Sequence, residues 1–218
     1  QFYQAGNSEA VSAQCLITGR VAPMALLHPT IKGVKDAQSS GASLVSFNAP
    51  AFCSYGHVQG ENAPVSEYAA FAYTTALNAL LADREHCKII GDSTVVCWAE
   101  NAGTAYADLG TYAMFGVPEN AGVQEEDLKK SLALLAEGKP CEWIGETLLP
   151  EQHINYLGLA PNAARVSVRF YLRDSLQHFA ENIRAHHEAL EIVNGWPGFS
   201  IWTLARETVR RKADGKYE

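Results

Sequence analysis

The sequence predicts an α+β fold, in which a mixed or antiparallel sheet of about five or six strands carries helices on at least one face. Short β-rich runs alternate with amphipathic helical segments, and two pairs of apolar runs are separated only by turn residues, as in hairpins. With 47% hydrophobic and 19% charged residues, the composition is that of a globular protein. The 218 residues suffice for one domain or for two closely packed subdomains, residues 1–140 and 141–218.

The first third of the chain predicts two strands and one helix. Residues 13–18 and 43–48 combine β-branched or aromatic side chains with turn-like flanks, which favours strands. Ser66 follows Pro64 and precedes a glutamate, a pattern typical of a helix N-cap. The helix that begins there is expected to end near Ala82.

The middle of the chain predicts a hairpin followed by two helices. Apolar residues 87–91 and 93–99 flank a turn-compatible Gly91 and Asp92. A short helix is expected at 105–115. Residues 125–138 form a clearer helix, with acids in the first turn, leucines at helical spacing and a terminal glycine. We expect residues 140–152 to be a variable linker.

The last third predicts a second hairpin and two helices. Residues 154–160 and 164–172 alternate as strands around a turn at Pro161 and Asn162. Asp174 and Gln177 then form a pattern typical of a capping box at the start of a helix. A last helix is expected at 200–212.

Residues 28–62 are the most informative segment, because this long polar loop contains two lysines and several glycines around a short apolar run. Uncharged amides and hydroxyls beside a few cations suit a phosphate backbone better than a metal or a small acid. We therefore single out its nucleic-acid-binding candidates: Lys32, Lys35, Gln38, Ser39, Ser40, Asn48, Gln59 and Asn62. Asn48, Gln59 and Asn62 are candidates for reading base edges, and their alternative role is the capping of turns around Pro50 and Pro64. Tyr55 either stacks on a base or anchors the loop to the core.

Arg165 and Arg169 complete the candidate set. Four residues apart on a strand, they project to one face at a separation of about 13 Å, roughly twice the phosphate spacing along one nucleic-acid strand. Arg173 extends the row. The alternative is that these arginines lie on a solvated face or pair with acids from the middle of the chain.

The net charge of −7 opposes a protein that coats nucleic acid over its whole surface. Residues 61–159 hold most of the acidic side chains, whereas both flanking segments are slightly basic. A nucleic-acid face built from the first and last segments is consistent with this distribution.

A metal centre is a weaker hypothesis. Asp92, Glu100 and Asp108 could be proposed as the ligands of a two-metal nuclease, but their spacing does not impose convergence. The five cysteines lie at wide, irregular spacing, which favours buried thiols in a reducing compartment over zinc. We expect no cofactor. Without a long apolar run or a basic-then-apolar leader, the expected location is the cytoplasm.

Several blocks of the sequence resemble the large subunit of the type I-C CRISPR surveillance complex, Cascade. The first block is residues 28–62, continuing through NAPVSEYAAFAYTTALNALL. The second is GDSTVVCWAE at 91–100. The third is LGLAPNAARVSVRF at 157–170, followed by the helix containing FAENIRAHHEALEI. The blocks occur in the family's order and span roughly residues 13–209. Because the family's subunit is considerably longer, the chain resembles an internal fragment of it.

The resemblance implies a subunit that has no catalytic site of its own. Such subunits read the protospacer-adjacent motif on duplex DNA, bind the target and help to stabilise the R-loop in antiviral defence. The implied partners are other Cascade subunits and crRNA, the target duplex and its displaced strand, and a helicase-nuclease recruited in trans. In this reading Lys32, Lys35, Arg165 and Arg169 contact the backbone. Two alternatives are a scaffold that docks to other Cascade subunits or a phage inhibitor through its acidic middle, and a metal-dependent nuclease.

Overall fold

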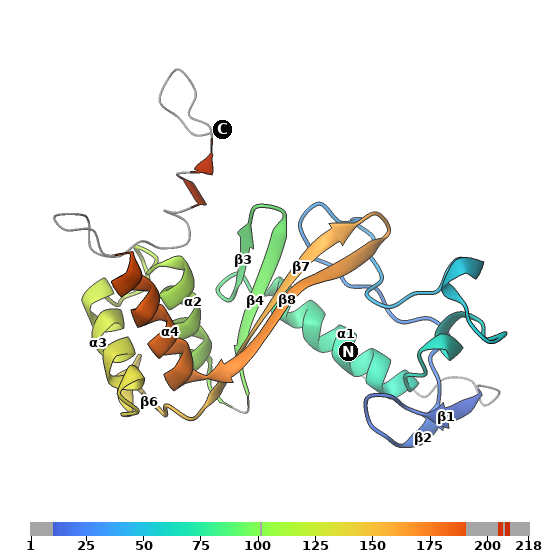
Figure 1. The fold of residues 1–218 in the computed structure, drawn as a ribbon, viewed down its shortest axis with the longest axis horizontal. Helices are drawn as coiled ribbons and strands as arrows, with labels where there is room; N and C mark the ends of the chain where they lie inside the picture. The colour runs from blue at the N-terminus through green and yellow to red at the C-terminus, as the bar shows by residue number, and fades with distance from the viewer. Residues whose placement is uncertain (1–10, 101, 191–204, 207, 210–218) are drawn as a thin grey trace. The chain divides into compact units, whose positions relative to one another are not determined.

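The computed structural model describes residues 11–100, 102–190, 205, 206, 208 and 209, and it confirms the α+β class. The largest sheet in this part of the chain has four strands in the order β3-β4-β7-β8, rather than five or six (Figure 1). Its strands are β3 (Cys87–Ile90), β4 (Ser93–Ala99), β7 (His153–Asn162) and β8 (Arg165–Ser175). The remaining four described strands form two separate two-stranded sheets, which accounts for the smaller central sheet.

The chain divides into two compact units. Unit 1 contains Gln1–Thr94 and Gly158–Arg169, and unit 2 contains Val95–Leu157 and Phe170–Glu218. Strands β4, β7 and β8 each contribute residues to both units.

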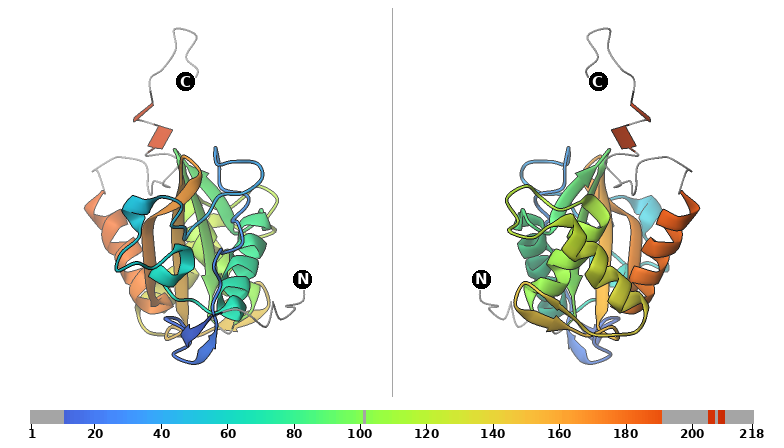
Figure 2. Two further views of the ribbon diagram at one scale, coloured as in Figure 1. Left: turned by 90° about the vertical axis from the view of Figure 1, so that its right-hand side faces the viewer. Right: turned by 90° about the vertical axis from the view of Figure 1, so that its left-hand side faces the viewer.

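Unit 1 combines a hairpin, a long helix and a long loop (Figure 2). Strand β1 (Ser12–Gln14) pairs antiparallel with β2 (Val21–Pro23), and helix α1 spans Glu67–Ala82. The N-cap prediction for α1 is confirmed, because the Ser66 side chain accepts a hydrogen bond of 3.2 Å from the Ala69 amide. Two 3-10 turns interrupt the loop, η1 (Pro50–Phe52) and η2 (Gln59–Asn62).

Both strands predicted in the first third need correction. The strand expected at 13–18 ends at Gln14, since the Gly19 amide donates to the Cys15 carbonyl and closes a turn there. The segment 43–48 is not a strand. Only its first residue, Ser43, forms a bridge, a parallel one with Arg165, and the rest runs on as loop toward η1.

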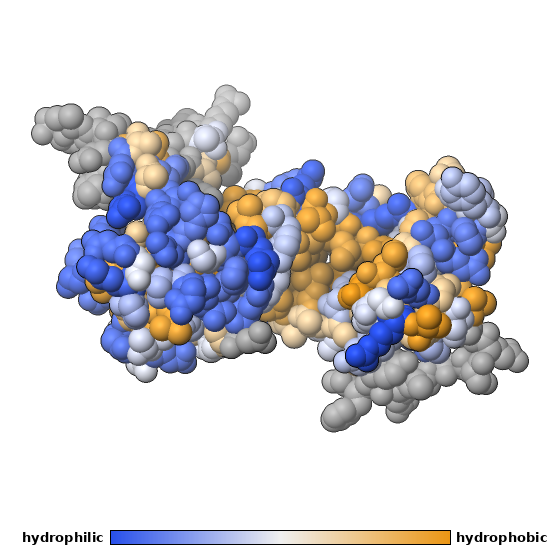
Figure 3. All heavy atoms as spheres, turned by 60° about the horizontal axis from the view of Figure 1, so that its bottom comes forward, coloured by the Kyte–Doolittle hydropathy of each residue, from blue (hydrophilic) through white to orange (hydrophobic). Residues whose placement is uncertain are grey.

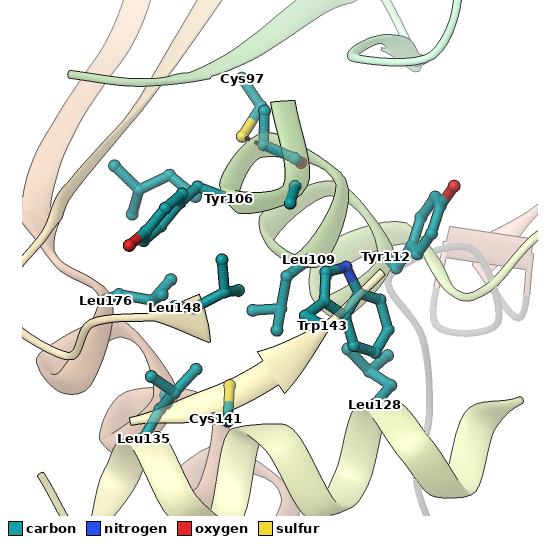
Figure 4. Close-up of a cluster of buried hydrophobic side chains, with 14 of the residues drawn as sticks. Cys97, Tyr106, Leu109, Tyr112, Leu128, Leu135, Cys141, Trp143, Leu148 and Leu176 are labelled. Carbon is teal, nitrogen blue, oxygen red and sulfur yellow. Dashed lines mark hydrogen bonds between the residues drawn. The ribbon is translucent and has the colours of Figure 1, made fainter. Parts of the chain in front are cut away.

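Unit 2 packs three helices and a small hairpin around one core. The helices are α2 (Thr104–Phe115), α3 (Glu125–Ala136) and α4 (Leu176–Ala189), and the hairpin is β5 (Cys141–Trp143) with β6 (Glu146–Leu148). Trp143 and Leu148 are 2% and 0% exposed, and Trp143 meets Tyr112 of α2 edge-on with 6.2 Å between the ring centres (Figure 4). The prediction of a variable linker at 140–152 is therefore wrong, because this segment supplies core side chains.

The second hairpin and the helix after it lie close to their predicted positions, with small displacements. The turn between β7 and β8 lies at Ala163 and Ala164, two residues beyond Pro161 and Asn162. Ser175, not Asp174, caps α4 by accepting a hydrogen bond from the His178 amide, while Asp174 contacts the His178 ring. Most of the helix predicted at 200–212 lies outside the described residues.

Within the described part of the chain, no helix is long and apolar enough to cross a membrane. The surface in Figure 3 is mostly hydrophilic over the helices of unit 2. Exposed apolar side chains occur on and beside the β1–β2 hairpin of unit 1, including Leu16, Val21 and Leu27.

Candidate nucleic-acid interface

All ten residues predicted to contact nucleic acid belong to unit 1. Eight lie on the loop 28–62 and two lie on β8, and most of their side chains are exposed, with Asn62 and Arg165 half-buried. The long loop lies against β8, because the Val166 amide donates to the Ser43 carbonyl at 3.0 Å. Two segments that are far apart in sequence therefore meet in one unit.

Lys35 and Arg169 converge on the turn between β3 and β4. The Lys35 Nζ donates to the Gly91 carbonyl at 2.9 Å, and Arg169 Nη2 donates to Asp92 Oδ2 at 2.9 Å. The Lys35 amide also donates to Thr94 Oγ1 at 2.9 Å, which fixes the loop beside the start of β4. We call Lys35, Asp92 and Arg169 the turn cluster.

The turn cluster contains one acid, Asp92, and a second acid, Asp36, lies beside it. Besides the Asp92–Arg169 pair, Lys35 Nζ lies 4.0 Å from Asp36 Oδ2. The Ser93 hydroxyl and then Arg169 hold the pKa of Asp92 below its usual range, so this carboxylate is charged at neutral pH. All four charged side chains are 41–72% exposed, and exposed pairs of this kind exchange partners readily. A phosphate can therefore compete for both cations.

Arg165 forms a second group with residues of the loop. Its Nη2 donates to Asn48 Oδ1 at 2.5 Å, and its guanidinium carbon lies 4.3 Å from the centre of the Phe52 ring. These contacts order the guanidinium and leave Asn48 with its amide N–H groups as donors. Arg165 and Arg169 both belong to β8, four residues apart, as the sequence predicts.

Asn62 is used within the loop. Its Oδ1 accepts from the Ser54 amide at 2.8 Å, and its Nδ2 donates to the Gln59 carbonyl at 3.0 Å. This is the turn-capping role that the sequence left open for it. Gln59 has a φ of 44°, begins η2 and is exposed.

The remaining candidates lie on a separate bend of the loop. The Lys32 amide donates to Asn78 Oδ1 of α1 at 2.8 Å, while its exposed side chain has no carboxylate within 4.0 Å among the described residues. Gln38, Ser39 and Ser40 are exposed in a turn closed by the Gly41 amide and the Gln38 carbonyl, 2.9 Å apart. Gly41 is required there, because its φ is 99° and a Cβ would lie 2.5 Å from Thr30 Oγ1.

Two of the three carboxylates considered as metal ligands, Asp92 and Glu100, contact arginines. Asp92 belongs to the turn cluster, and Glu100, in unit 2, accepts hydrogen bonds of 2.6 and 3.0 Å from Arg173. Arg173 foremost, with Asn155, lowers the pKa of Glu100 to about 2. Among residues 11–100, 102–190 and the four others described, no group of three His, Cys, Asp or Glu side chains is arranged to hold a metal ion.

Sequence reasoning missed Phe52, the aromatic partner of Arg165, and did not identify Asp92 as the acid that pairs with Arg169. Each contact joins residues far apart in the chain, and no local pattern indicates such a pairing. The sequence identifies Asp92 more simply as a turn residue. Tyr55, for which two roles were open, is 99% exposed and so does not anchor the loop to the core.

Comparison with known proteins identifies the family. The sequence model of the family described as CRISPR-associated protein (Cas_Csd1) matches residues 1–218, the whole of the chain. No curated relative matches. The chain therefore belongs to the Csd1 family of CRISPR-associated proteins.

Proposed function

We propose that this chain is part of the non-catalytic large subunit of a type I-C CRISPR surveillance complex. In this role it contributes to recognition of the protospacer-adjacent motif, to target DNA binding and to R-loop stabilisation. Membership of the Csd1 family supports a place in a Cascade-type assembly. The partners proposed are the other Cascade subunits, crRNA, the target duplex and the displaced strand, in the cytoplasm.

The observation that carries the proposal is the turn cluster. Lys35 from the loop and Arg169 from β8 bind to adjacent residues of one turn, and both side chains are about half exposed. Arg165 lies four residues away along β8, at about 13 Å. A row of cations at this spacing can follow a phosphate backbone and position the protein on it, while guide pairing supplies sequence discrimination.

The proposal assigns bond breaking to another protein. Cleavage of phosphodiesters by metal-dependent nucleases needs carboxylates that are free to bind ions. Asp92 and Glu100 instead accept hydrogen bonds from arginines. We therefore propose that a helicase-nuclease recruited in trans cuts the target.

The test is the salt dependence of target binding by the assembled complex. Replacing Lys35 and Arg169 together by alanine should weaken binding to the target duplex. The logarithm of the binding constant falls with the logarithm of the salt concentration. In the variant this fall should be less steep, by about 0.9 in slope for each phosphate that is no longer neutralised. The measurement is a titration of labelled duplex at several salt concentrations.

A matched control removes the same charges from unit 2. Lys139 and Arg184 are 62% and 51% exposed, and each pairs with one glutamate. Their double alanine variant should keep the wild-type slope. If the Lys35 and Arg169 variant also keeps the wild-type affinity and slope, the turn cluster does not contact DNA.

A further inference from the structure

The loop between η1 and η2 displays an aromatic side chain at its tip. Tyr55 is 99% exposed, the largest exposed fraction among the large apolar and aromatic side chains of the described residues. Its backbone has a φ of 53°, in the left-handed region, and Gly56 follows with a φ of 77°. A Cβ on Gly56 would meet nothing within 4 Å, so the space beside the tyrosine is open.

Hydrogen bonds on both sides of Tyr55 fix the loop conformation that exposes its ring. The Ser54 amide donates to Asn62 Oδ1 at 2.8 Å, and the His57 amide donates to the Ser54 carbonyl at 3.0 Å. The Val58 amide donates to Glu61 Oε2 at 2.9 Å. A left-handed conformation at a residue other than glycine is strained and persists where its surroundings impose it. These hydrogen bonds thus hold the ring in solvent, where it gains nothing from the chain's own core.

The chemistry around the ring favours a nucleic-acid base over an apolar protein pocket. Immediate neighbours of Tyr55 are serine, glycine and histidine, and the exposed apolar side chains of the loop, Phe52 and Val58, lie three residues away on either side. Three residues before it, Phe52 carries the Arg165 guanidinium over its face, so a cation is fixed at the base of the same loop. An exposed ring beside an ordered cation is the pattern by which proteins hold single strands.

We propose that Tyr55 is a stacking platform for an unpaired base of the opened target DNA. Bases inside a duplex are already stacked on both faces, so only an unpaired base offers a free face to the ring. The cation at Arg165 would neutralise a phosphate of the same strand. This inference rests on the proposed function, because it requires that unit 1 approaches target DNA.

The test uses the assembled complex with its guide RNA and a target that carries 2-aminopurine next to the adjacent motif. Opening of the duplex raises 2-aminopurine fluorescence, and stacking on an aromatic ring quenches it. Wild type and Tyr55→Phe, which keeps the ring, should both quench the probe. Tyr55→Ala and Tyr55→Leu should leave it bright and weaken binding to a pre-opened target about tenfold, the effect of one base–aromatic stack.

The control is Tyr68→Ala, which removes another exposed tyrosine of unit 1, 59% exposed on α1, and should behave as wild type. If Tyr55→Ala and Tyr55→Leu keep quenching and affinity while the Lys35 and Arg169 variant loses affinity, the stacking role is wrong and the proposed function stands. If neither changes DNA binding, both fail. If Tyr55→Leu binds like wild type while Tyr55→Ala binds weakly, or Tyr55→Ala loses partner subunits on purification, Tyr55 is an apolar protein contact and the inference is overturned.

Discussion

Asp92 determines how available Arg169 is to a phosphate. Its carboxylate accepts from Arg169 at 2.9 Å, and its lowered pKa keeps it charged throughout the neutral range. It also occupies the turn between β3 and β4, where asparagine fits as well as aspartate. The sequence left open that these arginines pair with acids from the middle of the chain instead of contacting DNA. Arg169 does pair with such an acid, Asp92, yet both side chains remain exposed.

Asp92→Asn should increase the affinity of the assembled complex for target duplex two- to fivefold, because Arg169 is no longer shared with a carboxylate. The increase should be largest at low salt, where phosphate attraction is strongest. Duplex titrations at two salt concentrations measure it.

The control is Glu137→Gln, which makes the same charge change at a pair with Lys139 in unit 2. Equal effects of the two substitutions would mean that only the total charge of the protein matters, and that Asp92 has no particular relation to the DNA contact.

Residue roles could be predicted only where a local pattern fixes them. Strand alternation placed Arg165 and Arg169 on one face, and polarity identified the loop. The partners of these residues come from remote segments: Asn48 and Phe52 for Arg165, and Asp92 for Arg169. Sequence order carries no signal for such contacts without knowledge of how the loop lies against β8.

Among the elements of the described residues, the helices and the two hairpins of the central sheet were predictable, whereas the two small hairpins were not. Ser66 caps the start of α1, and Gly138, with a φ of 71°, follows the end of α3. Both were predictable because caps act within one turn of their own helix. The short β5–β6 hairpin lies where the sequence predicts a linker. Its strands span three residues each, and burial of Trp143 against α2 depends on tertiary packing that no local pattern shows.

Helix α2 provides a test of packing against propensity. Alanine is intrinsically more favourable than glycine in a helix by about 1 kcal/mol. At Gly110, however, a Cβ would lie 2.2 Å from Ile154 Cδ1 and 2.6 Å from Tyr156 Oη, inside the core of unit 2. Gly110→Ala should therefore lower the free energy of unfolding by about 1–3 kcal/mol, the usual cost of overpacking.

Chemical denaturation of the purified protein measures this change. A stabilised Gly110→Ala variant would contradict the packing described for α2, since propensity alone predicts stabilisation.

In the molecule as a whole, the two units differ in net charge. Unit 1 holds seven basic and seven acidic residues, so the entire net charge of −7 belongs to unit 2. The ten candidate residues all lie in the neutral unit, which a polyanion can approach without general repulsion. The sequence indicated this asymmetry by thirds of the chain. It did not reveal that residues 158–169 belong to unit 1 together with residues 1–94. Strand pairing, rather than composition, determines that these two segments form one unit.

In the proposed function, the turn cluster contacts the backbone of target DNA. A structure of the assembled complex on target DNA tests it most directly. We expect Lys35 Nζ and Arg169 Nη2 to lie within hydrogen-bond distance of phosphate oxygens, about 2.7–3.2 Å. Both side chains facing solvent or another subunit, with the DNA bound elsewhere, would contradict it.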